Sequence, residues 1–431
     1  MIDITGAMPA KQPFYGWKNA FLLSFIYLAT SGMVFYAFSV IFPFMLKETG
    51  WNRGDASIAI TIATLAGGFL IPLAAKLLNK YGSRKLIIIG LAISCVNLLL
   101  LGTVVTKLWH WIAIWGLLLP LGRLLSGLLP SQVNIMLWFN RKRATAMGLL
   151  MTGAPIGGAL APPVFTWFIA HMGGSRYGWY LSAGVTFLAL IASFWVVSKP
   201  SDLGQYPDGI APGTLAPGEQ AGVAFKNRTF RSSSVWTLRE VLKSRTLWLY
   251  TLAGLAQSLT LGIVVYHGVL HLTDIGISKM NAAMVLSSVT ISSGIVRFPI
   301  GWLGDRVEPR WIYFTALIFS LIGFVGIWKA PSIPLLMVLG SIYGIGYGSI
   351  LSIGSTLLGN YYGPEVFPSI RGALGPFLTL FGAGVPTIAG YAMEIQGNYN
   401  SVFFWLAVFL GVGILCSAFL TPPQKPAQEA V

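Results

Sequence analysis

The chain has 431 residues, of which 55% are apolar and only 10% are charged, and its mean hydropathy is +0.72. So few charges cannot cover the surface of soluble domains of this total size, so the composition excludes an ordinary soluble protein and predicts lipid as the main solvent. The net charge of +15 does not indicate nucleic acid as a partner, because the basic residues form no stripe with interleaved aromatics.

Twelve apolar segments are long enough to cross the hydrocarbon core, which takes about 20 residues. In chain order we expect spans at residues 19–45, 56–79, 86–106, 110–138, 145–170 and 178–198, and then at 247–272, 282–304, 311–329, 333–358, 371–394 and 401–420. The charged residues fall almost entirely in the gaps between them, as the cost of a charge in lipid requires. The sequence therefore predicts an all-α membrane protein of twelve transmembrane helices.

A single long gap divides the spans into two sets of six. It covers residues 199–246 and is rich in Pro, Gly and Ser, which predicts an irregular linker. Its segment 235–245 mixes apolar and charged residues as an amphipathic helix on the cytoplasmic face would, or it is a plain connector. We expect an N-terminal six-helix bundle over residues 1–198, this linker over 199–246, and a C-terminal six-helix bundle over 247–431.

The distribution of Lys and Arg predicts the orientation of the chain. Most of these residues lie in gaps on the side that also holds the linker and both ends of the chain. Because cytoplasmic loops are enriched in Lys and Arg, both termini are predicted to be cytoplasmic. We expect a multi-pass protein of the plasma (inner) membrane, with the lipid bilayer as its main partner.

Two loops carry related sequences at the same place in the two halves. Asn79-Lys-Tyr-Gly-Ser-Arg84-Lys follows the second span, and Gly-Trp-Leu-Gly-Asp305-Arg306-Val-Glu-Pro-Arg310 follows the eighth. Repetition at corresponding positions favours two bundles related by an axis along the membrane normal.

These loops resemble the loop motif of the major facilitator superfamily, and further segments are similar to its monocarboxylate porter and oxalate:formate antiporter branches. The further segments include Gly50-Trp-Asn-Arg53, Trp138-Phe-Asn-Arg-Lys-Arg143 and Asn360-Tyr-Tyr-Gly363. The resemblance covers nearly the whole chain. It implies the major facilitator fold and secondary active transport by alternating access, and we expect a monomeric functional unit and no cofactor.

The resemblance also implies roles for the loop residues. In the family, the loop Asp caps helix ends across the two halves and helps to latch the outward-open state, with the motif Arg residues as its partners. Asp305 with Arg306 and Arg310 follows this pattern in the second loop. In the first loop Arg84 is present, but Asn79 stands where Asp is expected, which implies a weaker latch.

Two arginines lie inside expected spans, where a charge needs compensation. Arg297 has no acidic residue close in sequence. In the related transporters an Arg in this span binds the substrate carboxylate, a geometry that the guanidinium fork favours. The alternative is that Arg297 extends to the cytoplasmic interface. Arg123 begins a segment similar to the superfamily's Arg-x-x-x-Gly motif, and for it we expect a structural role, bonded to a neighbouring helix, rather than ligand binding.

The charged residues that the spans lack narrow the class of substrate that the sequence predicts. The eleventh span contains no Lys, whereas the oxalate-type transporters add one there to hold a dianion, so a single substrate cation favours a monoanion. No acidic residue lies at the middle of any span, which disfavours proton coupling by a buried carboxylate. His267 and His271, near the outer end of the seventh span, are proton-coupling candidates, or else histidines satisfied at the interface. A proton could also accompany the acid in the binding equilibrium.

Polar and aromatic side chains within the spans are further candidates for the substrate site. They are Tyr27, Tyr36, Asn134, Gln257, Tyr266, Tyr343 and Tyr347. Tyr347 is favoured because the glycines at 344, 346 and 348 permit close backbone approach.

The sequence as a whole predicts a secondary active transporter of small monocarboxylates, such as lactate, in symport with a proton. The alternative is an organic anion exchanger or a drug effluxer of the same superfamily. A membrane enzyme is disfavoured because no carboxylate run accompanies any of the four histidines, so neither an acid–base pair nor a set of metal ligands is evident.

Overall fold

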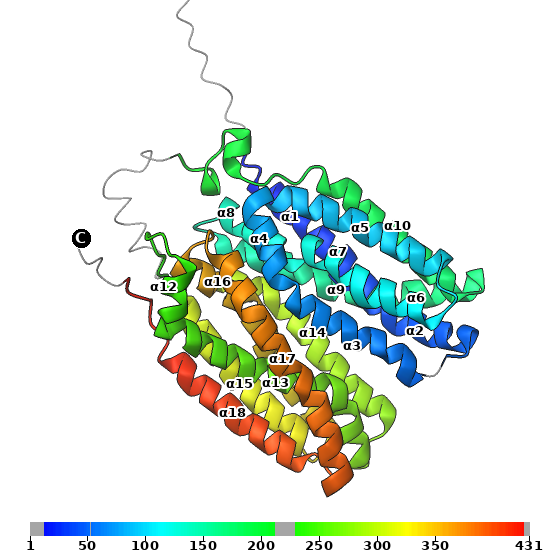
Figure 1. Ribbon diagram of the computed structural model, residues 1–431. Helices are drawn as coiled ribbons and strands as arrows, with labels where there is room; N and C mark the ends of the chain where they lie inside the picture. Colours follow the sequence, from blue (N-terminus) through cyan, green and yellow to red (C-terminus); the bar gives the residue numbers. More distant parts are fainter. Residues whose placement is uncertain (1–12, 52, 212–228, 426–431) are drawn as a thin grey trace, which may run out of the picture.

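The computed structural model describes residues 13–51, 53–211 and 229–425 (Figure 1). These residues are almost entirely helical and contain no strand. The first six expected spans correspond, in order, to α1 (Gly16–Tyr27) with η1 (Leu28–Val34) and α2 (Phe35–Thr49); α3 (Arg53–Phe69) with α4 (Ile71–Tyr81); α5 (Ser83–Thr103); α6 (Leu108–Trp111) with η2 (Ile112–Leu118), α7 (Leu119–Ser126) and α8 (Leu128–Trp138); α9 (Arg143–Met172); and α10 (Ser175–Ser193).

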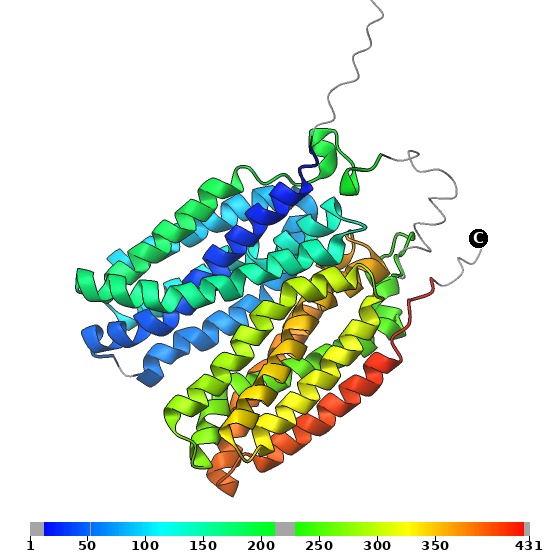
Figure 2. The same cartoon turned by 180° about the vertical axis from the view of Figure 1, so that it is seen from behind.

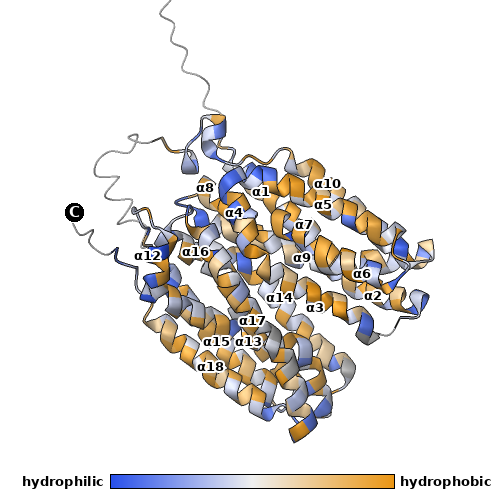
Figure 3. Ribbon diagram, viewed as in Figure 1, coloured by the Kyte–Doolittle hydropathy of each residue, from blue (hydrophilic) through white to orange (hydrophobic). Residues whose placement is uncertain are grey.

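The second six spans are single long helices. They are α13 (Arg245–Asp274), α14 (Lys279–Gly304), α15 (Pro309–Lys329), α16 (Ile333–Tyr362), α17 (Phe367–Gln396) and α18 (Asn400–Ala418). Among the residues described, nine helical stretches are long and apolar enough to cross a membrane, and α3 with α4 makes a tenth, bent by 46°. The expected sixth and eleventh spans correspond to α10 and α17. Figure 3 shows apolar residues along the bodies of the helices.

The helices form two groups that lie side by side, α1 to α10 in one and α13 to α18 in the other (Figures 1 and 2). The groups meet chiefly where α9 packs against α14 and where α3 and α4 pack against α17. Glycines permit this approach: a methyl group added at Gly301 would lie 2.4 Å from the carbonyl oxygen of Ala144, and one at Gly148 would lie 2.6 Å from that of Arg297.

Two boundaries differ from the prediction for physical reasons. The bend between α3 and α4 lies beside Pro72, which removes a backbone donor from the helix. The sixth helix ends at Ser193 rather than at residue 198. The chain turns there because the carbonyl oxygen of Val197 accepts hydrogen bonds from Asn19, Asn134 and Trp138.

The two described parts of the linker pack on the same end of the molecule, which we call the linker face. The first part forms the short turns η3 (Pro200–Leu203) and η4 (Pro207–Gly209). The carboxylate of Asp208 accepts hydrogen bonds from the backbone amides of Asn140, Arg141 and Lys142. The linker is therefore bound to the loop that joins α8 to α9.

The expected amphipathic helix of the linker is shorter than predicted, since α12 covers only Leu238–Lys243. Thr237 and Glu240 cap its start reciprocally. Its apolar side chains pack on the protein: Val241 is fully buried, and Trp236 meets the ring of Tyr362 edge-on. These side chains are covered by the chain itself rather than exposed to lipid headgroups.

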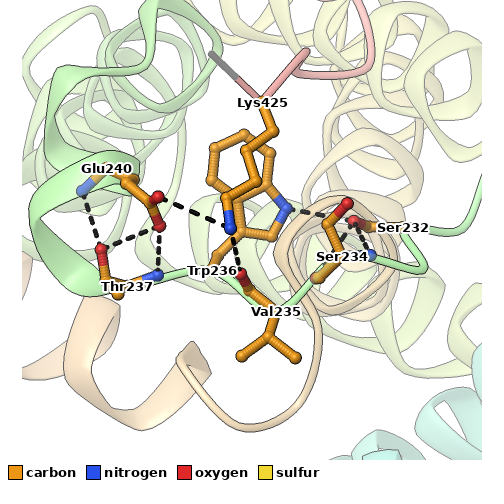
Figure 4. A network of polar contacts seen from close by, with 7 residues as sticks. All are labelled: Ser232, Ser234, Val235, Trp236, Thr237, Glu240 and Lys425. Carbon is orange, nitrogen blue, oxygen red and sulfur yellow. Dashed lines mark hydrogen bonds and ion pairs between the residues drawn. The ribbon is translucent and has the colours of Figure 1, made fainter. Parts of the chain in front are cut away.

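The end of the described chain docks beside α12 (Figure 4). The ammonium of Lys425 donates to the carbonyl oxygen of Val235 at 2.9 Å and lies 3.6 Å from a carboxylate oxygen of Glu240. Both side chains of this ion pair are partly exposed, so it contributes little to stability on its own.

Candidate functional site

Arg297 lies in α14 at the contact between the two groups of helices. Its Nη1 donates to the carbonyl oxygen of Met151 in α9 at 2.8 Å, and its Nη2 donates to Ser293 Oγ at 3.4 Å. The side chain is only 7% exposed, and its Nε has no partner. Within the described ranges the one ion pair is that of Lys425 with Glu240. The guanidinium of Arg297 therefore meets neutral acceptors and no carboxylate.

Two tyrosines lie within electrostatic reach of Arg297, and a third lies within reach of both of them. Tyr27 of α1 is within electrostatic reach of Arg297 and of Tyr36 in α2. Tyr347 of α16 is within reach of the same three residues. We call these four residues together with Arg123 the central cluster. It draws on both groups of helices, since Tyr347 and Arg297 belong to the second group and the other three residues to the first.

Arg123 belongs to this cluster, and the structural role expected for it stays a prediction. It is half-buried in α7 and lies within electrostatic reach of Tyr27. Its guanidinium carbon is 4.9 Å from the ring centre of Phe35 in α2. In the part of the chain that the structure describes, its guanidinium donates no hydrogen bond to a neighbouring helix.

Two π-helical segments adjoin the central cluster. The segment η1 separates Tyr27 from Phe35 and Tyr36, and η2 leads directly into α7. In a regular α-helix nine residues turn about two and a half times, which would place Tyr27 and Tyr36 roughly on opposite faces. The wider π turn reduces this rotation, so both rings can approach the same arginines. Such bulges occur frequently at functional sites.

Asn134 is not part of the central cluster, although it was a candidate for the substrate site. It is fully buried near the linker face, where its Nδ2 donates to Ser83 Oγ and to the carbonyl oxygen of Val197. Its Oδ1 accepts from Asn19. All these partners lie within the first group of helices or its connection to the linker. The geometry indicates that Asn134 holds the ends of α1, α5, α8 and α10 together.

Gln257 and Tyr343 belong to a network inside the second group of helices, although Tyr343 is also within electrostatic reach of Tyr347 in the central cluster. Tyr343 is fully buried, and its hydroxyl contacts Gln257 Nε2 at 3.3 Å and Thr260 Oγ1 at 3.2 Å. Its ring packs near Phe324 inside the second group of helices. The hydroxyl group of Tyr343 therefore has its hydrogen-bond partners within the second group of helices. Of the other aromatic candidates, Tyr266 is largely exposed on the outside of α13.

The two candidate histidines lie in the last turns of α13, at the end opposite the linker face. His267 Nδ1 is 3.4 Å from the hydroxyl of Tyr399, and His271 Nε2 is 3.3 Å from the carbonyl oxygen of Trp328. Counting helical rise along α13 and α14 separates His271 from Arg297 by roughly 20 Å. A proton held by either histidine would therefore not touch an anion bound at Arg297.

Asp305 joins the two groups at the linker face, in the geometry that the loop motif implies. Its carboxylate accepts from the backbone amides of Ala144 and Thr145 at 2.8 and 2.9 Å, and from Thr145 Oγ1 at 2.5 Å. These groups form the N-terminus of α9, which favours a negative charge. Burial raises the pKa of Asp305, and the hydrogen bonds from Thr145 and Ala144 oppose this shift.

The first loop makes a weaker contact across the groups: Asn79 Nδ2 donates to Ser369 Oγ at 3.2 Å. The expectation that the motif arginines pair with the loop carboxylate is wrong for the described geometry. Arg84 donates to the carbonyl oxygen of Phe194, Arg306 to that of Trp302 and Arg310 to that of Leu420. Each bond stays within one group of helices.

Arg143 makes the cross-group contact that sequence reasoning missed. Its Nη1 donates to the carbonyl oxygen of Gly359 at 2.7 Å and to Asn360 Oδ1 at 2.9 Å, and the side chain is 5% exposed. The signal was present in the sequence, since Arg143 and Asn360 belong to two segments that carry the family resemblance. Nearby, Gln132 Nε2 donates to Ser355 Oγ at 2.6 Å, again across the groups.

The last part of the linker touches both groups at this face. Arg231 Nη2 donates to the carbonyl oxygen of Arg141, and the amide of Ser232 donates to that of Asn360. The amide of Phe230 donates to Glu308, whose pKa is raised by burial. All hydrogen bonds that join the two groups directly, among those the structure describes, lie from Arg297 toward the linker face.

Comparison with known proteins identifies the family. The family model for the Major Facilitator Superfamily matches residues 21–283 and 269–431. The chain therefore belongs to the major facilitator superfamily. It is a multi-pass membrane transporter rather than an enzyme, and the recognition made from its loop motifs is confirmed.

Particular relatives are similar over most of the chain. Monocarboxylate transporter 13 of Bos taurus is 26% identical over 442 residues, which cover 97% of this chain and 95% of the relative. Monocarboxylate transporter 2 of Rattus norvegicus is 27% identical over 392 residues, 86% of this chain and 75% of the relative. The crystal structure of the transporter FucP in the outward conformation has a TM-score of 0.69 at 14% identity, covering 94% of this chain and 98% of its own. That likeness supports the fold alone.

Proposed function

We propose that the protein is a symporter of small monocarboxylates and protons that works by alternating access, with the linker face toward the cytoplasm. The observation that carries the proposal is Arg297, a buried cation at the contact between the helix groups whose described partners are all neutral. A buried guanidinium favours an anionic ligand, and a carboxylate matches its fork. The names of the relatives support a monocarboxylate as cargo.

In this proposal the substrate controls the contact between the two groups of helices. The Nη1 of Arg297 now bonds the carbonyl oxygen of Met151 across that contact. A carboxylate that accepts two hydrogen bonds from the guanidinium competes with this carbonyl, because a charged acceptor binds more strongly. Binding thereby loosens α14 from α9 and favours opening of the linker face. Arg297 would thus both bind the anion and release the hydrogen bond that joins α14 to α9 when the anion is bound.

The proton is proposed to enter with the acid rather than through a carboxylate in the membrane. The described acidic residues lie at helix ends or in loops, and none belongs to the central cluster. His267 and His271 remain candidates, but their separation from Arg297 favours a role in packing α13 against Tyr399. Replacing both by Gln is expected to leave the proton dependence of uptake unchanged.

The test is uptake of radiolabelled L-lactate into proteoliposomes, with and without an inward proton gradient. Uptake is expected to rise with the gradient in the wild type and to be lost in Arg297→Ala. Arg306→Ala is the matched control, since Arg306 is exposed and its hydrogen bond to Trp302 stays within the second group of helices. Uptake that ignores the gradient but is stimulated by internal anion would instead indicate exchange. Full transport by Arg297→Ala would refute the role of Arg297.

A further inference from the structure

We propose that Arg231 is a releasable contact by which the linker holds the two groups of helices together at the linker face. The linker then takes part in closing that face and does not merely connect the two halves. This inference rests on the alternating access of the proposed function but not on its cargo. It concerns linker residues 230–232, which we call the strap. The strap is bound to the second group of helices and reaches the first group through one side chain.

Backbone hydrogen bonds fix the strap to the second group on both sides of Arg231. The amide of Phe230 donates to a carboxylate oxygen of Glu308 at 2.6 Å. The amide of Ser232 donates to the carbonyl oxygen of Asn360 at 2.7 Å. Glu308 directly precedes α15, and Asn360 belongs to α16. The backbone of the strap is therefore held at two points by helices of the second group.

The chain that follows the strap is also bound to the second group. Figure 4 shows that Ser232 Oγ accepts hydrogen bonds from the amide of Ser234 and from Trp236 Nε1. Trp236 is buried, and its ring meets that of Tyr362 in α16 edge-on. These contacts continue the attachment that Ser232 begins, so the strap is expected to move with the second group.

Arg231 makes the contact of the strap with the first group. Its Nη2 donates to the carbonyl oxygen of Arg141 at 3.0 Å, in the loop that joins α8 to α9. The amide of the same Arg141 donates to Asp208 at 2.7 Å. The two described parts of the linker thus bind the two backbone groups of one residue. Among the hydrogen bonds that the structure describes, no other joins residues 229–244 to the first group of helices.

The surrounding charges favour an arginine at this place. Asp305, Asp208 and Glu308 lie within electrostatic reach of the guanidinium of Arg231, and Arg141 opposes them. Three negative charges against this one positive neighbour attract the guanidinium toward the closed face. One of the three carboxylates, that of Asp305, itself accepts hydrogen bonds across the groups. Arg231 therefore lies where the two groups are already joined.

The bond between Arg231 and Arg141 cannot survive opening of the linker face. Its donor is fixed to the second group, whereas its acceptor belongs to the first, so separation of the groups pulls the two apart. A single hydrogen bond from a charged donor is strong enough to affect the closed state and weak enough to break repeatedly. Removing it is expected to raise the open population about 10-fold.

The test measures how often the linker face opens. Maleimide labels S355C in a protein whose two native cysteines are replaced by serine, and Ser355 is 7% exposed and hydrogen-bonded to Gln132 across the groups. Arg231→Gln should raise the labelling rate about 10-fold. Arg231→Lys keeps the charge and one donor group, so its rise should be smaller. Arg239→Gln is the matched control, because Arg239 is an exposed arginine of α12 in the same part of the linker. An unchanged rate in Arg231→Gln, or an equal rise in the control, overturns the inference.

A second measurement leaves Arg231 unchanged and decides the matter should the Arg231 variants fail to fold. Trypsin can cleave after Arg231 only while this side chain is released from the face. Arg143→Met removes two hydrogen bonds across the groups, so cleavage after Arg231 should accelerate in step with S355C labelling. Faster labelling without faster cleavage overturns the inference.

Neither measurement uses a substrate, so a wrong cargo in the proposed function changes neither result. A wild type whose S355C reacts as fast as an exposed thiol refutes the closed linker face. That outcome overturns the inference together with the proposed role of this face in alternating access.

Discussion

Removing the guanidinium of Arg143 should open the linker face. Arg143→Met deletes two hydrogen bonds from a charged donor across the helix groups, to Gly359 and Asn360. At the lower end of the range for such bonds, about 1.5 kcal/mol each, the closed arrangement loses about 3 kcal/mol, which raises the open-to-closed ratio about 150-fold. The lower end applies because removing a buried charge also relieves its desolvation.

The assay is maleimide labelling of a reporter cysteine, S355C, introduced after both native cysteines are replaced by serine. Ser355 is 7% exposed and hydrogen-bonded to Gln132 across the groups, so the thiol becomes reactive only when the groups separate. While the open population stays small, the labelling rate follows it and should rise about 150-fold in Arg143→Met. The control is Arg306→Met, which removes an exposed arginine of the same face. A rise below about 3-fold, or an equal rise in the control, refutes the reasoning.

Three further changes can be read with the same reporter. Asn79→Asp should slow labelling about fivefold, because a carboxylate near the N-terminus of α17 accepts a stronger bond than the present amide makes. Gly301→Ala should speed labelling about 10-fold, since its methyl group would meet the carbonyl oxygen of Ala144, whereas Gly184→Ala has open space and should change nothing. Burial raises the pKa of Asp305 in the closed arrangement above that of a solvated carboxyl, so protons favour the closed state. Acidifying the linker side should therefore slow labelling, and an unchanged pH dependence in Asp305→Asn would contradict this assignment.

The sequence predicted the elements of this protein well and its contacts poorly. Long apolar runs separated by charged gaps define membrane helices whatever their neighbours are, since the cost of a charge in lipid is set by the solvent. The loop around Asp305 identified both the family and one contact between the halves. Arg297 was found because an arginine in an apolar run is conspicuous.

Other residues could not be assigned from the sequence. Asn134 and Tyr343 are polar residues within spans, and so are Tyr27 and Tyr347. Their sequence context does not show which of them are hydrogen-bonded inside one helix group and which lie beside a buried arginine. The partners that make the difference, Val197 for Asn134 and Gln257 for Tyr343, come from other helices. For Arg143 the family resemblance marked the segment, but its partner Asn360 also comes from another helix.

The sequence by itself determined the fold class, the number and order of the expected spans and the family, because these depend on the solvent of each segment and on short local motifs. Only the tertiary structure decided which cations face neutral partners, which face of each helix its side chains occupy and which end of the molecule is closed. Arg123 illustrates the reason. Its place beside Phe35 and Tyr27 depends on packing between helices distant in sequence and on two π segments, which change the facing of side chains without changing the hydropathy of the span.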